Sequence, residues 1–221
     1  MKDPQIDGGF GIMRDEGRSG DWSQTWTGGR FYTSDPRPGD ISILDIAMAL
    51  GNMARYNGHC RFYSVAEHSI LVSYMVPSEH ALCALAHDFT EAYIADITRP
   101  TKRALGKNNT YFELEDSIWK KAIAPKFGLP LDLPECVKYA DAQIIHVEKE
   151  RLFPRSDDWD LSMVEYPEGK VPINGFPPFQ ASLMLLRRFC ELTGADFESL
   201  SEKFITLNLE DEGLIVAKKE K

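Results

Sequence analysis

Apolar side chains recur at intervals of three and four residues in successive stretches of this chain, and this spacing is that of one buried face of an α-helix. Such stretches joined mainly by short loops predict an all-α core of about six helices. A length of 221 residues with 43% apolar content is suited to one well-buried domain. The expected helices cover approximately residues 40–57, 65–77, 78–97, 111–128, 135–153 and 179–192.

The two ends of the chain differ from its periodic middle. Gly28 and Gly29 lie between aromatic and β-branched residues, which predicts a small β-hairpin over residues 25–32. Alternation of apolar and polar residues from Phe204 onward makes a second, C-terminal hairpin an option. A proline-rich connection over residues 154–178 is expected to be irregular. The expected division is a flexible glycine-rich tail, a helical domain and a C-terminal extension, at residues 1–24, 25–195 and 196–221.

Composition excludes several classes of partner. The net charge of −9 argues against a broad nucleic-acid groove and against an anionic membrane surface, so any phosphate must be met by local cations. No apolar run is long enough to cross a bilayer, and the first residues lack a secretory leader, so a cytoplasmic protein is expected. The four cysteines form no CxxC pair, and any metal would therefore need histidine and carboxylate ligands. These cysteines are Cys60, Cys83, Cys136 and Cys190.

Ionisable residues interrupt an otherwise apolar helical run, ALCALAHDFTEAYIADI. His87, Asp88 and Glu91 are spaced so that one helix would present them on one side. Because buried ionisable groups are costly unless they are paired or bind metal, an internal cation is an economical explanation. His68 in the preceding helix and Asp141 in YADAQII extend the set. Imidazole with carboxylate suits Mn, Fe, Co, Ni or Zn, which the sequence does not distinguish, better than Ca or Mg.

A His-Asp dipeptide alone is a weak signal, but the longer pattern is specific. The order His68, His87-Asp88, Asp141 resembles the H…HD…D ligand order of the HD-domain metal-dependent phosphohydrolases. The strings FYSVAEHS, AHDFTEAYIADITRPTK and VKYAD are similar to bacterial and prophage-borne 5′-deoxynucleotidases and to phage dATP triphosphohydrolases, over about residues 26–192. The resemblance implies a helical HD-domain core, one divalent transition-metal ion held by these four residues, and hydrolysis of a phosphate ester in a nucleotide.

The same resemblance implies roles for two acidic residues near the expected metal ligands. Glu91 would orient or deprotonate the attacking water as the general base, and its position one helical turn from His87 fits that role. Its alternative is a surface carboxylate at the start of a helix. Asp96, at the end of the same expected helix, would bind the deoxyribose hydroxyl.

Substrate contacts are implied for four further residues. Arg55 and Tyr56 resemble an Arg-aromatic pair in which Arg meets the phosphate and the ring lies near the sugar. Arg61 competes with Arg55 for the phosphate. Lys102, which follows the Thr-Arg-Pro break, would contact phosphate as a point charge, although a solvated surface lysine is the alternative.

Three functions follow from these residues and the resemblance. The first is a metal-dependent 5′-nucleotidase that hydrolyses deoxyribonucleoside 5′-monophosphates to deoxynucleoside and phosphate. The second is a deoxynucleoside triphosphohydrolase of the dATP type, which releases triphosphate from the same centre. The third is a catalytically silent nucleotide-binding HD module. The implied partners are a small deoxynucleotide and further copies of the chain in a homodimer or larger homo-oligomer, with no nucleic-acid polymer and no membrane.

Overall fold

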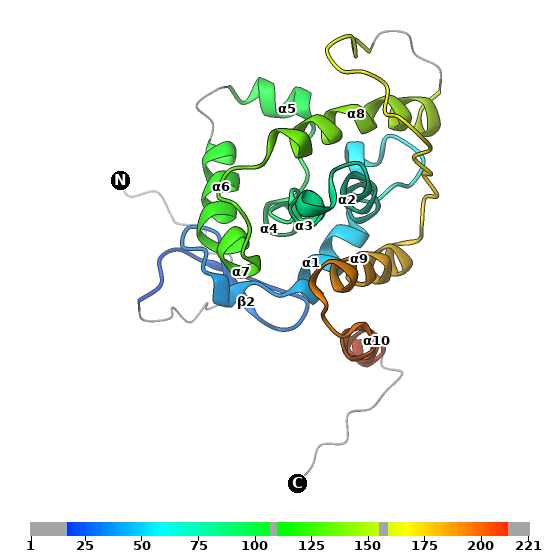
Figure 1. Cartoon of the computed structure of the whole chain (residues 1–221). Coiled ribbons are helices and arrows are strands. Elements are labelled where there is room, and N and C mark those ends of the chain that lie inside the picture. The colour runs from blue at the N-terminus through cyan, green and yellow to red at the C-terminus, as the bar shows by residue number, and fades with distance from the viewer. Residues whose placement is uncertain (1–16, 107–109, 155–158, 212–221) are drawn as a thin grey trace.

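A computed structural model describes residues 17–106, 110–154 and 159–211, with side chains described up to residue 208 (Figure 1). It confirms the predicted all-α class with a small N-terminal hairpin. Residues 1–16, which make up most of the expected tail, lie outside the described part. The helices are α1 (Ile43–Asn52), α2 (Val65–Tyr74), α3 (Ala81–Ala86), α4 (Glu91–Ile94), α5 (Arg99–Ala104), α6 (Thr110–Ile118), α7 (Ala124–Phe127), α8 (Glu135–Leu152), α9 (Pro178–Thr193) and α10 (Phe197–Asp211).

Local sequence signals fix several helix ends where they were expected. The Ser64 side chain accepts a hydrogen bond from the Glu67 backbone N–H and starts α2 at Val65. Gly128 adopts a left-handed conformation and ends α7, which continues from α6 through a π-helical turn over Trp119–Ile123. The described residues 159–177 form no helix or strand, as predicted for this connection.

The hairpin begins three residues earlier than expected. Strand β1 (Trp22–Gln24) pairs antiparallel with β2 (Arg30–Tyr32). Thr25, expected in the first strand, instead belongs to the turn, because its N–H donates to the Gly29 carbonyl and its carbonyl accepts from the Gly28 N–H. The positive φ of Gly28 is suited to that turn.

The expected third helix is not continuous. It is divided into a 3₁₀ turn (Ser78–His80), α3 and α4, and residues 87–90 lie between the two helices. Within this stretch the N–H of Phe89 donates to the Ala86 carbonyl and that of Glu91 to the Asp88 carbonyl, a three-residue spacing. Tighter winding brings residues three apart into line, so Glu91 is aligned with Asp88 and not with His87 as an α-helix would have it.

The break expected at Thr98–Pro100 separates α4, which ends at Ile94, from α5, which begins at Arg99, because proline is compatible with the first turn of a new helix. Another expectation is wrong. The optional C-terminal hairpin is replaced by α10, and Phe204 is fully buried there between the rings of Trp26 and Phe179. Phe197, Leu200 and Phe204 recur at helical spacing, and packing of this face outweighs the local alternation.

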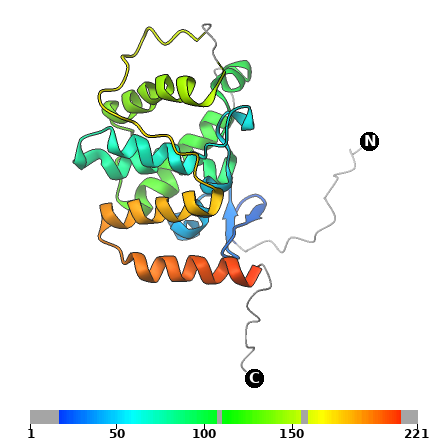
Figure 2. The same ribbon diagram turned by 90° about the vertical axis from the view of Figure 1, so that its right-hand side faces the viewer.

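Helix α2 lies in the middle of the molecule. In Figure 2, α8, α2, α9 and α10 appear as successive layers. Helix α9 packs against α1, α2 and α3, and Gly51 of α1 allows a close approach, since an added Cβ would lie 2.7 Å from the Pro178 carbonyl oxygen. Every residue of α2 from Val65 to Ser73 is buried, including Glu67 and His68. Because Glu67 and His68 are ionisable groups inside this buried helix, each needs a hydrogen-bonding partner.

Among the described residues, no helix combines the length and apolar character that crossing a bilayer requires.

Candidate metal centre and its cavity

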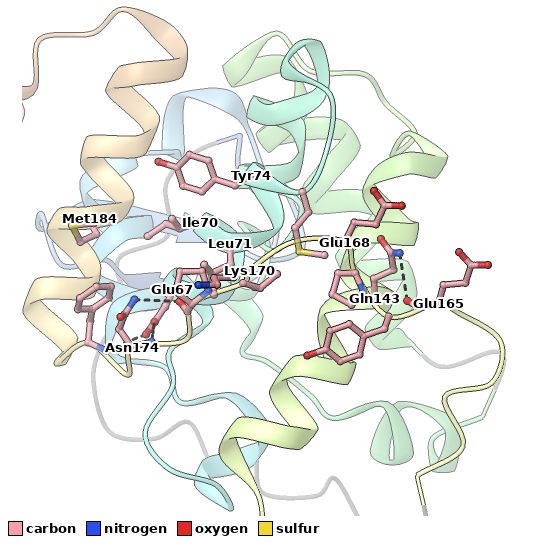
Figure 3. Close-up of a pocket in the computed structure, with 16 residues that line it drawn as sticks. Glu67, Ile70, Leu71, Tyr74, Gln143, Glu165, Glu168, Lys170, Asn174 and Met184 are labelled. Carbon is pink, nitrogen blue, oxygen red and sulfur yellow. Dashed lines mark hydrogen bonds between the residues drawn. The ribbon is translucent and has the colours of Figure 1, made fainter.

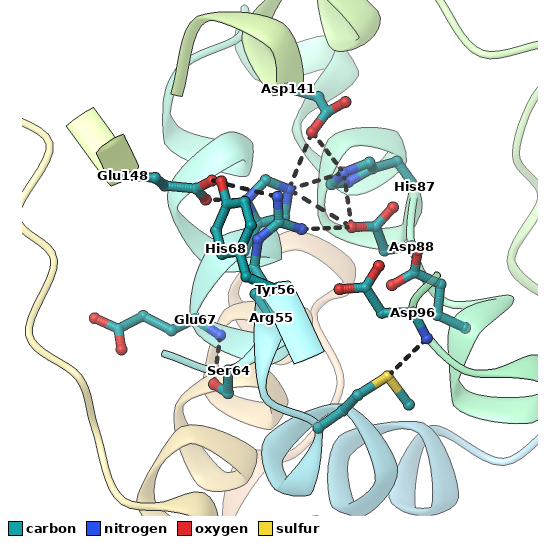
Figure 4. Close-up of polar contacts among 12 residues, drawn as sticks. Arg55, Tyr56, Ser64, Glu67, His68, His87, Asp88, Asp96, Asp141 and Glu148 are labelled. Atoms are coloured by element: carbon teal, nitrogen blue, oxygen red, sulfur yellow. Dashed lines mark hydrogen bonds and ion pairs between the residues drawn. The ribbon is translucent and has the colours of Figure 1, made fainter. Parts of the chain in front are cut away.

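Two histidines face each other at the centre of the fold (Figure 4). His68 comes from the buried helix α2 and His87 from the turn that follows α3. Their Nε2 atoms are 3.3 Å apart. The side chain of His68 has no exposed surface, and that of His87 is only 5% exposed. Both imidazoles are therefore withdrawn from water and direct the same ring nitrogen toward one point.

Two carboxylates approach the same point from different elements. Asp88 Oδ2 lies 3.2 Å from His87 Nε2 and 3.5 Å from His68 Nε2. Asp141, from α8, places Oδ1 3.2 Å from His68 Nε2 and 3.9 Å from His87 Nε2. All four residues predicted as metal ligands are thus brought together, although they belong to three segments separated by up to 73 positions.

The remaining nitrogen of each imidazole is held by a hydrogen bond. His68 Nδ1 lies 2.7 Å from Glu148 Oε1, and His87 Nδ1 lies 2.7 Å from the Ala84 carbonyl oxygen. A carbonyl or carboxylate oxygen can only accept, so Nδ1 carries a proton in each ring and Nε2 is the nitrogen left to bind a metal ion at the shared point. Metal-binding histidines are oriented in this way.

The electrostatics of the cluster favour positive charge at its centre. Burial lowers the pKa of His87, but Asp88 and Asp141 outweigh burial and raise it to about 9. Burial raises the pKa of Asp88, yet His87 and His68 bring it down to about 2. The pKa of Asp141 is also lowered, against burial, mainly by His68.

The donor set fits a transition-metal ion. Two ligand atoms each about 2.1 Å from one ion lie about 3.0 to 3.4 Å apart for right-angled or tetrahedral geometry. Among the separations of these donor atoms, 3.2, 3.2 and 3.3 Å lie in this range, and the other two, 3.5 and 3.9 Å, are longer. His68, His87 and Asp141 form a group that can hold a metal ion, and Asp88 contacts both imidazoles of that group.

Glu91 lies beside this cluster with one oxygen available. It is 4% exposed, and its Oε2 atom has no hydrogen-bond partner among the described residues. Its other oxygen, Oε1, is 3.9 Å from Lys102 Nζ. Burial, Asp88 and Asp96 together raise the pKa of Glu91 well above its usual range. A buried carboxylate oxygen without a partner at the edge of a cavity is placed to accept a hydrogen bond from a molecule in that cavity.

Ala95 directs the chain after α4. It has φ +69° and ψ 157°, a region that is almost restricted to glycine. Two hydrogen bonds stabilise this strained conformation: the Ala95 N–H donates to the Glu91 carbonyl, and the Ala95 carbonyl accepts from the Tyr111 hydroxyl at 2.6 Å. The following residue, Asp96, is half-buried and lines the cavity beside the cluster.

Arg55 and Tyr56 reach the cluster through Glu148, a completely buried carboxylate of α8. Glu148 Oε2 is 3.3 Å from an Arg55 guanidinium nitrogen and accepts from the Tyr56 hydroxyl. The same guanidinium lies 3.7 Å from Asp88. Tyr56 and Asn57 both have positive φ, so a strained turn presents this pair. Burial lowers the pKa of Arg55, but Glu148 outweighs burial and raises it. Burial raises the pKa of Glu148, but Arg55 and His68 outweigh burial and bring it down to about 2.

Helix α5 adds cations along the rim. Lys102 lies 3.1 Å from Glu115, and Arg99 pairs with the outer oxygen of Asp141 at 2.9 Å. Both line the cavity, as does Arg103. Arg61 is placed elsewhere: its exposed guanidinium donates to the Arg151 carbonyl, and it does not line this cavity.

The cavity next to the cluster has a volume of about 610 Å³, within the range typical of small-molecule sites. Seven residues predicted from the sequence line it, together with Arg99: they are Arg55, Tyr56, Asp88, Glu91, Asp96, Lys102 and Asp141. A cavity of about 680 Å³ lies on another side of α2 (Figure 3). Glu67 lines that second cavity, but its carboxylate already accepts from three backbone N–H groups at residues 174–176, so it serves to hold that segment.

Sequence reasoning missed several residues of the site. Glu148 follows Asp141 by seven residues, which places both on one face of a helix, and this spacing is the signal in the sequence that points to it. Arg99 immediately precedes Pro100 and had no signal beyond its charge. Phe153 and Trp159 line the cavity, and a tryptophan within an acidic, irregular stretch was the clue to the second of them.

Comparison with known proteins gives two informative relatives. The chain is 43% identical over 130 residues to the uncharacterized protein YfdR of Escherichia coli, a match that covers 58% of this chain and 71% of YfdR. It is 37% identical over 145 residues to the uncharacterized protein RCAP_rcc00048 of Rhodobacter capsulatus, covering 59% of this chain and 72% of that protein. No protein-family model matches the chain.

Proposed function

The chain belongs to the family of the Escherichia coli protein YfdR, and from its site geometry we propose that it is an HD-type, metal-dependent 5′-nucleotidase acting on deoxyribonucleoside 5′-monophosphates. The observation that carries the proposal is the convergence of His68, His87, Asp88 and Asp141 beside an unpartnered Glu91 oxygen, within the described residues. Hydrolysis of a phosphate ester needs positive charge, a positioned water and a base in one place, and this arrangement provides ligands and a base together.

A divalent transition metal held by these four residues supplies positive charge to the phosphate and makes a nearby water more acidic. Nitrogen and oxygen donors together favour Mn, Fe, Co, Ni or Zn. Glu148 and the Ala84 carbonyl keep both imidazoles in the tautomer that ligation requires. The protein contributes rigidity, since His68 is fixed within a helix that is buried along nearly its whole length.

The chemistry assigned to the other residues follows from their positions. Glu91 Oε2 accepts a proton from the attacking water, because this oxygen is buried beside the cavity and has no hydrogen-bond partner among the described residues. Arg55 and Lys102 bind phosphate oxygens from two walls of the cavity. Asp96 accepts a hydrogen bond from the deoxyribose hydroxyl. These substrates belong to the cytoplasmic nucleotide pool, and we propose that compartment.

One observation favours a second candidate, the triphosphohydrolase. Arg99 and Arg103 line the same cavity as Lys102, so α5 offers three cations along one short helix. A single phosphate does not need them all, whereas a triphosphate would. A catalytically silent module is less consistent with the site, because an unpartnered buried carboxylate costs stability without a catalytic use.

Product identification decides among these functions. The metal-loaded protein is incubated with dAMP, dADP and dATP, and free phosphate, triphosphate and nucleoside are quantified. We expect deoxyadenosine and phosphate from dAMP and no triphosphate from dATP. Triphosphate from dATP without turnover of dAMP would establish the second candidate, and no turnover of any nucleotide would leave the silent module.

A matched pair of variants tests the role of Glu91. Glu91→Gln is expected to lower turnover by at least about 100-fold while metal content is nearly unchanged. Glu113→Gln serves as the control, because it makes the same chemical change at an exposed residue of α6 that does not line the cavity. Full activity of Glu91→Gln would remove this residue from its assigned role.

A further inference from the structure

We propose that Phe153 and Trp159 form a stacking surface for the nucleobase of the nucleotide. This inference rests on the proposed nucleotidase function. We refer to these two side chains as the aromatic wall. It lies in the same cavity as the metal cluster, and neither residue is accounted for by metal binding, phosphate binding or proton transfer.

Three aromatic rings meet at this side of the cavity. The Phe153 and Trp159 centroids are 5.2 Å apart, and Tyr56 lies edge-on to Phe153 at 5.0 Å and 6.0 Å from Trp159. Tyr56 is anchored, because its hydroxyl donates to the buried Glu148. A continuous path of contacts therefore runs from His68 through Glu148 and Tyr56 to the aromatic wall, which fixes the wall relative to the metal cluster.

The aromatic wall differs from the core in its exposure and surroundings. Phe153 and Trp159 are half-buried, and both line the cavity, whereas the largest core side chains of the described residues have no exposed surface. Phe153 follows the last residue of α8, and Trp159 belongs to the irregular connection after it. Phe153 also packs against the core cluster that includes Tyr63, Val72 and Ile144, and its contact with the Trp159 ring extends this packed surface into the cavity.

The polarity of the cavity matches that of a nucleotide. Its lining combines the cluster carboxylates Asp88 and Asp141 and the cations Arg55 and Lys102 with the aromatic wall, Ile145 and Leu161. A nucleoside monophosphate has a dianionic end and a flat aromatic end joined by a sugar. With its phosphate at the cluster, its base is the part that requires an apolar, planar contact.

Binding of the base by stacking predicts that the site discriminates little among the four bases. Every base has a π-face, and contact through that face is tolerant of base identity because it does not use the hydrogen-bonding edge. The aromatic wall should therefore strengthen binding of all four deoxynucleoside monophosphates over a sugar phosphate that has no base. It should also favour purines moderately, since they offer a larger face.

The test compares a substrate that has a base with one that lacks it. Values of kcat/KM for dAMP and for 2-deoxyribose 5-phosphate are measured on the metal-loaded wild type, Trp159→Ala and Trp159→Phe. Removal of the indole is expected to reduce the preference for dAMP over the sugar phosphate by about 5- to 50-fold, mainly through KM. Trp159→Phe keeps a ring and should lose much less. Trp22→Ala, in the hairpin and outside the cavity, is the matched control and should keep the preference.

Equal losses on both substrates with Trp159→Ala, or no loss on either, would overturn the inference while leaving the nucleotidase proposal standing. A second measurement tests the aromatic wall in the case that the nucleotidase proposal fails. Calorimetric titration of dAMP into metal-loaded Glu91→Gln protein, with and without Trp159→Ala, reports binding without turnover. If no nucleotide is hydrolysed by the wild type but the tryptophan substitution weakens dAMP binding at least about 5-fold, the aromatic wall is supported and the nucleotidase proposal fails. Unchanged affinity would reject the aromatic wall.

Discussion

Replacement of Glu148 by Gln tests the most densely connected charge in the site. Glu148 has no exposed surface and contacts three partners: His68 at 2.7 Å, a guanidinium nitrogen of Arg55 at 3.3 Å, and the Tyr56 hydroxyl. Glutamine preserves the size of the side chain and removes its charge. The substitution therefore leaves Arg55 buried beside Asp88 alone and isolates the electrostatic contribution of one carboxylate.

Two routes give the magnitude. The pKa of Glu148, which burial raises, is brought from 4.5 down to about 2 by Arg55 and His68, and a drop of that size corresponds to about 3 kcal/mol of folding free energy at neutral pH. Removal of one partner from a buried ion pair costs about 3 to 5 kcal/mol in other proteins. We therefore expect Glu148→Gln to lower the free energy of unfolding by about 3 kcal/mol.

The same destabilisation has a defined pH dependence. Because the pKa of Glu148 is lower in the folded state, its stabilisation is complete above the unfolded value of 4.5 and is lost as pH falls from there toward 2. Urea unfolding in the presence of EDTA, at pH 7 and in steps down to the lowest pH at which the wild type stays folded, measures the difference without metal. The gap between wild type and variant should be constant above about pH 5 and narrow below it.

Glu148→Gln should also weaken metal binding. One oxygen of Glu148 accepts from His68 while the other serves Arg55 and Tyr56, and an amide has only one acceptor oxygen. If that oxygen keeps the guanidinium and the hydroxyl, the NH₂ group faces His68 Nδ1 and moves the imidazole proton to Nε2, where it blocks ligation. A 10- to 100-fold loss of Mn²⁺ affinity is expected by calorimetry.

Glu150→Gln, two positions along α8 and exposed, is the control and should change stability by less than about 0.5 kcal/mol. If Glu148→Gln unfolds within 1 kcal/mol of the wild type at pH 7 and binds Mn²⁺ equally well, the reasoning about this network is wrong.

Three further outcomes are expected. Glu67→Ala leaves three backbone N–H groups at residues 174–176 without their acceptor and should cost about 3 kcal/mol or more in urea unfolding; a loss below 1 kcal/mol would contradict this. Ala95→Gly should stabilise the protein by about 1 kcal/mol in the same assay, unlike most Ala→Gly changes, because φ is +69° there; destabilisation would argue against strain. Saturating Mn²⁺ should raise Tm by about 5 to 10 °C, reversibly with EDTA, and His87→Ala should abolish the rise; an equal rise in that variant would place the ion elsewhere.

Much of the fold follows from local patterns along the chain. The beginning of α2 after Ser64 and the end of α7 at Gly128 depend on short-range hydrogen bonding and on glycine's conformational freedom. The apolar stripe of α8 indicates its buried face, and Asp141 within that helix could be recognised as out of place. These features are readable because helix capping and periodic burial involve residues within one or two turns.

Features that depend on contacts between residues far apart in the chain could not be predicted from local sequence patterns. The sequence predicts His87 and Glu91 on one side of a single helix, but packing breaks that helix at residues 87–90. Burial of Phe204 between Trp26 and Phe179 selects a helix for α10 where alternation alone allowed a hairpin. Each outcome depends on surface buried against partners far along the chain.

The donor types of the candidate site were recognisable in order along the chain, because imidazoles and carboxylates in apolar helices are costly without a partner. Their convergence within 3.2 to 3.9 Å, the proton positions imposed by Glu148 and Ala84, and the aromatic wall beside them arise from how α2, α3 and α8 pack. Spacing along a chain specifies which groups a helix carries, whereas the direction in which it presents them to another helix is set by the shape of the core between them.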